Sequence, residues 1–414
     1  MGLPSITIEF IKKAVQAIKI GSTGIVGIIL TDTANVGILV LKDVSEIPDT
    51  FSDANKAYIE RAFAGSPSKV IVYTFGSVTT YSYAEAEPTG NENPKTLGWY
   101  ELVDDEYVAS DDTEVDAEKT YYIRTANTVT TTLSNALTYF KNTKVNFLCA
   151  MPDVSTANCT TIATWVKGVW KNTPNRPMVV LPATAGDHKA IINFAVTGAT
   201  AGSACIGVGD ESFTEAQYCS RIAGLLAGLP YTVSATYKPL TEVTSIPIVE
   251  PDTVSTAVDA GKLTLYDNGD NIVIARGVTS LQTVTQEETE DLKKIKIVCI
   301  QSLIESDLYT TINNSYIGNY TNSYDNKCLL ITAIGAYFKQ LDTSEGGAGY
   351  INENHSIEID LASQRTYLES KGIDTSSMSE QEIKEANTDS WVFLAGQVSI
   401  LDAIEDVKIR INKV

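Results

Sequence analysis

Histidine is almost absent from this 414-residue chain, and its few cysteines show no pattern. There are two histidines, His188 and His355, and six cysteines, and no two cysteines form a Cys-x-x-Cys pair. Metal centres need grouped Cys, His or carboxylate ligands, and His is the commonest general base. The shortage limits both kinds of site. We expect the cysteines to be buried free thiols in a reducing compartment.

Basic residues and long apolar runs are also scarce. The chain has 31 Lys and Arg against 51 Asp and Glu, a net charge of −20, whereas nucleic-acid binding needs clustered basic side chains. The apolar run over residues 24–30 is far too short to cross a bilayer. Glu9 interrupts the place where a secretory signal would need its apolar core. We therefore expect no nucleic-acid partner, no direct membrane insertion and no secretory signal.

Strands alternating with helices are predicted for the first half of the chain. Residues 23–32, 69–75, 145–152 and 178–183 read as buried strands, and residues 52–65, 155–172 and 214–230 read as helices. Residues 188–196 are predicted to begin a further helix. Such alternation favours an α/β fold with a mostly parallel sheet covered on both faces.

A different pattern begins near residue 250. Residues 262–278 contain Asn268-Gly269 between two apolar segments, which predicts a β-hairpin. Thr285 and Glu288 have the spacing of a capping box and predict that a helix opens there. Residues 325–341 form a long amphipathic helical pattern. This part of the chain is expected to be a separate α+β domain.

One strongly acidic segment stands apart from the rest of the sequence. Residues 85–122 contain twelve acidic residues and two basic ones, with short aromatic runs between acidic turns. We interpret it as a small β insertion at the surface, whose charge favours solubility and repels similar neighbours. Binding of a basic partner is the alternative interpretation.

Both ends of the sequence carry short alternating segments typical of amphipathic strands. The apolar positions are Ile6, Ile8 and Phe10 near the start and Val407, Ile409 and Ile411 near the end. After the last segment no further strand follows to cover its open backbone edge. Either the two ends pair with each other or with the local sheet, or they pair with another chain.

A catalytic or cofactor site is not indicated by the sequence. Asp187-His188 follows a predicted strand and is a candidate general base, but no Gly-x-Ser-x-Gly nucleophile motif accompanies it. The glycine-rich residues 198–210 lack the spacing of a dinucleotide-binding or phosphate-binding loop. We therefore predict that the protein is not an enzyme and needs no cofactor or metal. An α/β enzyme with an appended domain is one alternative, and a self-assembling surface-layer subunit is another.

Four segments, taken together and in order, resemble one known family. Residues 2–30, 262–284, 322–341 and 391–414 are similar to contractile tail sheath proteins. The resemblance is strongest to the short sheaths of Firmicute myophages, defective prophages and R-type bacteriocins, the clostridial diffocin-like ones especially. It does not distinguish a phage from a headless bacteriocin. It weakens in the acidic insertion, where related sheaths often carry a β-sandwich-like domain.

The resemblance implies a domain plan that the residue patterns alone do not give. It implies an N-terminal arm, a subtilisin-like α/β domain with the acidic β insertion, an α+β C-terminal sheath domain and a C-terminal arm. The corresponding ranges are 1–20, 21–250 with the insertion at 81–125, 251–400 and 401–414. The absence of a catalytic triad agrees with a structural use of the α/β domain.

The resemblance also implies how such a subunit works. Sheath subunits form hexameric rings in a helical sheath around a tail tube, between a baseplate and a tail terminator. The apolar positions of both arms would add strands to neighbouring subunits, and contraction would drive the tube through the target envelope. Such particles assemble in the bacterial host cytoplasm. Lys293, Lys294 and Lys296 are candidates for contacting tube carboxylates, or else they form a solvated helix end.

Overall fold

A twisted, mostly parallel sheet forms the centre of the body. The computed structural model describes residues 17–88 and 91–412. The seven strands run in the order β13-β10-β9-β8-β1-β3-β2, and only β2 is antiparallel to its neighbour. Their bounds are β1 Ile25–Thr31, β2 Gly37–Leu41, β3 Lys69–Phe75, β8 Phe147–Cys149, β9 Met178–Pro182, β10 Ile191–Phe194 and β13 Lys262–Leu263. The central strands are buried along almost their whole length, which explains their near-continuous apolar sequences.

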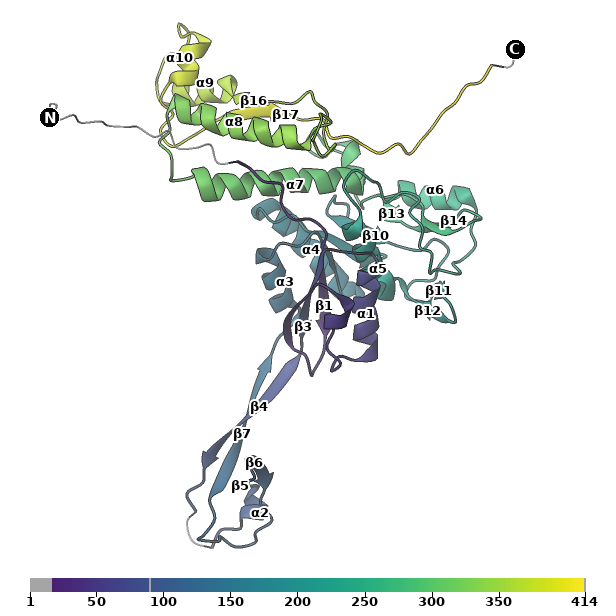
Figure 1. The fold of residues 1–414 in the computed structure, drawn as a ribbon, viewed down its shortest axis with the longest axis vertical. Helices are drawn as coiled ribbons and strands as arrows, with labels where there is room; N and C mark the ends of the chain where they lie inside the picture. The colour runs from purple at the N-terminus through teal and green to yellow at the C-terminus, as the bar shows by residue number, and fades with distance from the viewer. Residues whose placement is uncertain (1–16, 89–90, 413–414) are drawn as a thin grey trace, which may run out of the picture.

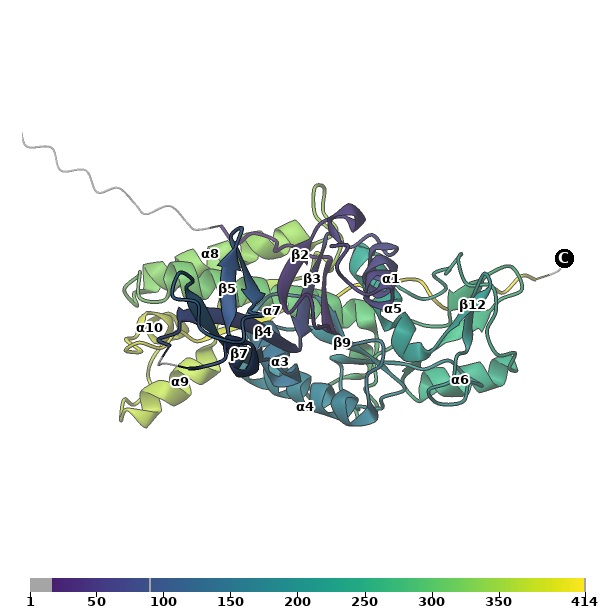
Figure 2. The ribbon, with the colours of Figure 1, turned by 90° about the horizontal axis from the view of Figure 1, so that it is seen from below.

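Helices cover both faces of this sheet, as the alternating pattern predicts. Helices α1 (Asp53–Phe63) and α5 (Glu215–Gly228) lie on one face, and α3 (Leu133–Asn142) and α4 (Thr156–Asn172) lie on the other (Figures 1 and 2). Hydroxyl caps start three of them, because the side chains of Ser52, Ser155 and Thr214 accept hydrogen bonds from backbone N–H groups of the first turn.

Helices α1 and α5 cross so closely that their backbones are in direct contact. A Cβ atom at Gly224 would lie 1.9 Å from the carbonyl oxygen of Ala62, and one at Gly65 would lie 2.0 Å from the carbonyl carbon of Gly224. No side chain fits at either position. The two helices can therefore pack closely only because both positions are glycine.

The prediction of a helix over residues 188–196 is wrong. Residues Ile191–Phe194 form β10, which lies parallel between β9 and β13 and is fully buried. A short run that is apolar on all sides has the same composition in a buried strand as in a buried helix, so periodicity could not separate them. The hairpin predicted over 262–278 is present as β14 (Leu265–Asp267) paired with β15 (Ile272–Ile274).

The acidic segment lies on a long two-stranded ribbon that carries it away from the body (Figure 1). Strands β4 (Ser77–Glu85) and β7 (Tyr121–Thr130) form the ribbon, and β5 (Tyr100–Val103) and β6 (Glu106–Ala109) complete a four-stranded sheet at its tip. A short helix, α2 (Pro94–Leu97), precedes β5. Trp99, Tyr121 and Ala86 form a small core of its own. Tyr83 and Tyr107 stack with ring centroids 3.8 Å apart.

Two layers of helices lie above the body in Figure 1. Helix α7 (Ile295–Thr311), extended by a π-helical turn at Ile312–Tyr316, is packed between the body and the layer that contains α8 (Tyr324–Leu341). The second layer also holds α9 (Leu361–Ser370), α10 (Glu380–Glu385), β16 (Ser356–Ile359) and β17 (Leu394–Gln397). A side lobe contains β11 (Ile206–Val208), β12 (Glu211–Phe213) and α6 (Pro251–Asp259).

The helix expected to open at the second capping box begins ten residues later. Thr285 instead closes a local turn: its hydroxyl accepts from the N–H of Glu288 at 3.0 Å, and its own N–H donates to the carbonyl oxygen of Glu288 at 2.9 Å. A 3₁₀ turn at Glu290–Lys293 follows, and α7 begins at Ile295. The same residue types thus favour a turn as readily as a helix start.

The six cysteines are all free, as predicted, and four of them, Cys149, Cys159, Cys219 and Cys299, are buried. Burial raises the pKa of the Cys149 thiol to about 12, so it is chemically inert at neutral pH. Across the part of the chain that the structure describes, no helix combines the length and the apolar character that crossing a membrane requires.

Candidate functional site at the root of the C-terminal tail

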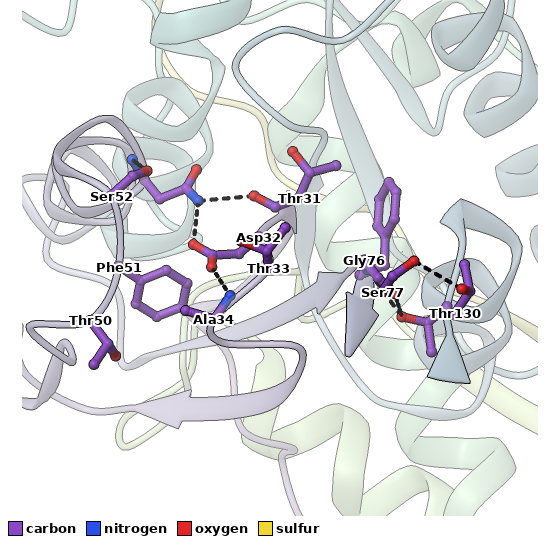
Figure 3. Close-up of a pocket in the computed structure, with 13 residues that line it drawn as sticks. Thr31, Asp32, Thr33, Ala34, Thr50, Phe51, Ser52, Gly76, Ser77 and Thr130 are labelled. Carbon is purple, nitrogen blue, oxygen red and sulfur yellow. Dashed lines mark hydrogen bonds between the residues drawn. The ribbon is translucent and has the colours of Figure 1, made fainter. Parts of the chain in front are cut away.

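A cavity of about 630 Å³ lies at the carboxyl edge of the sheet, where ligands often bind in α/β proteins (Figure 3). Its single charged side chain, Asp32, accepts hydrogen bonds from the N–H of Ala34 at 2.8 Å and from the side-chain amide of Asn55 at 3.1 Å. Burial alone would raise the pKa of Asp32, but these hydrogen bonds outweigh it and lower the pKa. The carboxylate therefore holds the loop after β1 and is poorly placed to act as a base.

Asp187 and His188, the candidate general base of the sequence analysis, are likewise held in place by hydrogen bonds. The Asp187 carboxylate accepts from the N–H of Gln282 at 2.7 Å and from the hydroxyl of Thr283 at 2.6 Å, and these bonds lower its pKa to about 2. Nδ1 of His188 accepts from the N–H of Ala190 at 3.0 Å, and burial lowers the pKa of His188 to about 4. Both side chains fasten the loop before β10. Within residues 17–88 and 91–412, no three His, Cys, Asp or Glu side chains group as metal ligands.

The most elaborate polar cluster lies where the C-terminal tail leaves the body. The side chain of Glu405 is 5% exposed, and one of its oxygens accepts from the hydroxyls of Ser234 and Thr236, both at 2.7 Å. Its other oxygen lies 3.2 Å from Nε of Arg276 and 3.3 Å from Nζ of Lys294. We call this set of five side chains the tail clamp.

Neighbouring contacts strengthen the tail clamp. Arg276 also pairs with Asp406, and Lys294 also pairs with Asp402. Burial alone would raise the pKa of Glu405, but the hydrogen bonds from the two hydroxyls and the charge of Lys294 outweigh it and lower the pKa. The carboxylate is therefore charged at neutral pH, and the clamp is a partly buried ionic cluster in which one Glu405 oxygen accepts hydrogen bonds and the other makes ion pairs.

All three candidate tube-contact lysines have partners inside the subunit. Lys294 belongs to the tail clamp, and Lys296, only 6% exposed, donates to the carbonyl oxygen of Leu401. A buried ammonium cannot reach an outside carboxylate, so the predicted tube contact does not fit Lys296. Lys293 pairs with Glu290 at 2.9 Å across one 3₁₀ turn, and for the partly exposed Lys293 and Lys294 the tube contact stays a prediction.

Beyond the clamp the tail is extended and exposed. Val407, Ile409 and Ile411 expose 71%, 76% and 87% of their surface. Residues 401–412 form no strand in the described chain, and Figure 1 shows them running away from the body. The strand predicted for this segment is therefore absent within the isolated subunit. The N-terminal positions Ile6, Ile8 and Phe10 lie outside the described residues.

Close to the tail root lies a small sheet with open edges. β16 and β17 pair antiparallel, and no third strand joins them in the part of the chain that the structure describes. The sheet rests on α8, where the side chain of Ile357 packs beside Gly335. A two-stranded sheet is at best marginally stable by itself, and both outer edges can accept a further strand.

Sequence reasoning missed the tail clamp. Arg276 and Glu405 are 129 positions apart, and Ser234 is farther still. The one local signal is the pair Glu405-Asp406 within an otherwise alternating segment, which interrupts the apolar positions just before Val407.

The fold is that of sheath subunits from contractile particles. The sheath tail protein of Desulfitobacterium hafniense superposes with a TM-score of 0.59 at 16% identity, covering 86% of this chain and 94% of that one. The helical sheath of the anti-feeding prophage in its contracted state gives a TM-score of 0.62 at 10% identity, covering 100% and 99%. No family model matches the sequence.

One sequence relative settles the family. The tail sheath protein of Clostridium phage phiCD119 is 34% identical over 419 residues, which cover 99% of both chains. The chain therefore belongs to the tail sheath proteins. It is a structural subunit of a contractile sheath, located in the tail of a phage or of a related contractile particle.

Proposed function

We propose that this subunit builds its sheath with its two terminal arms, residues 1–20 and 401–414, which are rooted in their own subunit at Ile18 and Glu405 and whose outer parts are lent to neighbouring copies. The observation that carries the proposal is the tail beyond the clamp, which presents Val407, Ile409 and Ile411 to solvent on alternate positions of an extended backbone. Three exposed aliphatic side chains on one strand face are costly in water and gain by burial in a partner. The arm therefore suits addition to a sheet edge of a second copy.

The acceptor in this proposal is the sheet of β16 and β17. An added strand would gain about four or five backbone hydrogen bonds, each worth about 1 kcal/mol net. Burial of three aliphatic side chains would add roughly 1.5–3 kcal/mol each. Part of this gain offsets the loss of conformational freedom in the arm. The apolar positions of the N-terminal arm, Ile6, Ile8 and Phe10, would occupy a second edge in the same manner.

The wider assembly follows from the same proposal. Rings of six subunits would stack helically around a tail tube, between a baseplate and a terminator, and the particle would assemble in the bacterial host cytoplasm. The body at 21–250 would act as a subtilisin-like scaffold without enzymatic activity or cofactor. The segment at 81–125 would be its acidic insertion, and residues 251–400 would form the C-terminal sheath domain.

A variant with Val407, Ile409 and Ile411 all replaced by serine tests the proposal. We expect it to fold normally, because these side chains are mostly exposed in the subunit, but to remain as discrete particles in negative-stain electron microscopy. The matched control replaces Lys408 and Arg410, on the other face of the same segment, by serine and should polymerise. Polymerisation of the triple variant at the wild-type concentration would overturn the proposal.

A further inference from the structure

A cavity of about 590 Å³ opens between the end of α7, the start of α8 and the loop that precedes β17. Its wall is mostly apolar and includes Ile312, Ile317, Leu330 and Val392. Ile317 exposes 65% of its surface and Val392 exposes 39%, so apolar side chains stand at the mouth as well as inside. A cavity of this composition favours an aliphatic or aromatic occupant.

One buried cation lines the same cavity. Lys327 is 3% exposed, and its ammonium donates to a neutral partner, the hydroxyl of Thr388, at 3.2 Å. No carboxylate of the described residues lies within ion-pair distance of it. Asp389, which also lines the cavity, is paired with Lys371 at 3.2 Å and with the hydroxyl of Tyr367 at 2.8 Å.

A second polar atom at the cavity has no hydrogen-bond partner among the described residues. The side-chain oxygen of Asn322 is buried without a hydrogen bond, while its amide nitrogen donates to Thr388, to the carbonyl oxygen of Asp389 and to that of Trp391. Burial lowers the pKa of Lys327, which marks the cost of holding this charge without a counter-ion. The cavity thus offers apolar walls around a cation that has no anionic partner in the described part of the chain.

The chain itself holds a segment with the complementary chemistry. Glu9 is the only acidic residue among the first 31 positions, and Ile8 and Phe10 flank it. The cavity wall at Ser390 and Val392 directly precedes β17, whose edge is part of the proposed acceptor sheet. A strand that reaches this sheet edge would pass the mouth of the cavity.

We propose that this cavity receives Ile8-Glu9-Phe10 of a second copy of the chain, with the Glu9 carboxylate as counter-ion of Lys327. The inference rests on the proposed lending of arms and adds to it a docking position for the N-terminal arm. Because side chains alternate along an extended segment, Glu9 would face the wall that carries Lys327, and Ile8 and Phe10 would face the apolar side chains at the mouth. The carboxylate accepts from the ammonium, so the charge that is costly in the free subunit becomes paired only on assembly.

Disulfide cross-linking between two populations of subunits tests the contact. One population carries Glu9→Cys and the other carries Ile317→Cys, at the mouth of the cavity. After co-assembly and mild oxidation, a dimer band is expected on a non-reducing gel, and it should disappear on reduction. The matched control pairs Glu9→Cys with Val129→Cys, which is 66% exposed on the distant ribbon. Polymers that show no more Ile317 cross-link than the control would overturn the docking position while leaving the exchange of arms intact.

A double-mutant cycle tests the ion pair itself. Glu9→Gln is expected to raise the critical concentration for polymerisation by about tenfold in the wild-type background, as for loss of a charge-assisted hydrogen bond. In a Lys327→Met background, which replaces the cation by an apolar chain of similar length, Glu9→Gln should have little further effect. An equally large effect in both backgrounds would show that Glu9 and Lys327 are not partners. If instead the serine variant of the C-terminal tail polymerises normally, the arm-lending proposal itself fails.

Discussion

The two extended segments near the chain ends, residues 17–24 and 401–412, are held by opposite kinds of force. In the first, Ile18 is 1% exposed in the main core, and the N–H of Gly21 donates to the Asp307 carboxylate at 2.9 Å. In the second, charged groups around Glu405 fix the root, and the aliphatic side chains beyond it are exposed. Apolar burial anchors the segment that stays within the subunit, and an ionic cluster anchors the segment that is free to leave it.

The comparison predicts different sensitivities for the two segments. Burial of Ile18 does not depend on salt, whereas ion pairs near the surface weaken as salt screens them. The tail clamp is only partly buried, so it should respond to salt and acid before the core does.

The largest effect is expected from Ile18→Ala. Because Ile18 is fully buried in the core, its truncation should lower the free energy of unfolding by about 2–5 kcal/mol, measured by urea denaturation of the subunit. Ile20→Ala, in the same segment but 39% exposed, is the matched control and should cost much less. Ile409→Ala should leave subunit stability unchanged. Equal losses for Ile18→Ala and Ile409→Ala would remove the contrast between the two segments.

The next effect concerns the tail clamp. Glu405→Gln leaves Arg276 and Lys294 without a shared carboxylate, which should weaken the root by about 1–3 kcal/mol. We expect faster hydrogen exchange at the N–H of Leu401, which donates to the carbonyl oxygen of Tyr350 at 2.9 Å, with little change in global unfolding. Asp406→Asn is the matched control, because the Asp406 side chain is 83% exposed. Unchanged exchange in Glu405→Gln would mean that the clamp does not fix the root.

Acid should release the tail clamp. The pKa of Glu405 is lower in the folded subunit than its ordinary value of 4.5, so its stabilising contribution is full above that value. The contribution is lost as the pH falls through the lowered pKa. Proteolysis of the tail by an acid-active protease should therefore rise only as the pH falls below the ordinary value of 4.5, and Glu405→Gln should abolish this pH dependence. A pH dependence that persists in this variant would assign it to another group.

The smallest effect is expected for Lys293, a candidate tube contact outside the tail clamp. Lys293→Glu should weaken binding of the sheath to its tube in a salt-dependent manner, by less than about 1 kcal/mol per contact, because the lysine is partly exposed. Co-sedimentation of polymers with tubes at two salt concentrations measures it. Lys339→Glu, in the last turn of α8, is a charge-matched control. Equal binding by wild type and Lys293→Glu would remove the tube contact from the proposal.

Local patterns predicted much of the fold because local chemistry decides it. The capping residues Ser52 and Thr214 and the turn at Asn268-Gly269 act within a few positions and were readable directly. Residues 191–194 were misassigned because burial on all sides removes periodicity.

The tail clamp was not predictable, because it joins Ser234, Arg276, Lys294 and Glu405 through the tertiary fold. The tertiary fold also decides which lysines of the segment 293–296 are exposed, and the sequence does not show this. Their spacing indicates a charged surface, but only the packing of α7 against the body shows that Lys296 is buried. The exposed C-terminal tail was predicted in part. Its alternating apolar positions were visible in the sequence, but the sequence did not show that residues 401–412 pair with no strand of the isolated subunit.

The glycine contact between α1 and α5 bears on what happens when a sheath shortens. Where two backbones touch directly, no side chain can rotate to let one helix slide over the other, so the central body resists deformation. Each subunit should then travel as a solid block during the stroke. A hinge in the C-terminal tail is then expected at Asp406, the one residue between Glu405 of the tail clamp and Val407 of the proposed strand, so adjacent blocks could swing only a short way without parting.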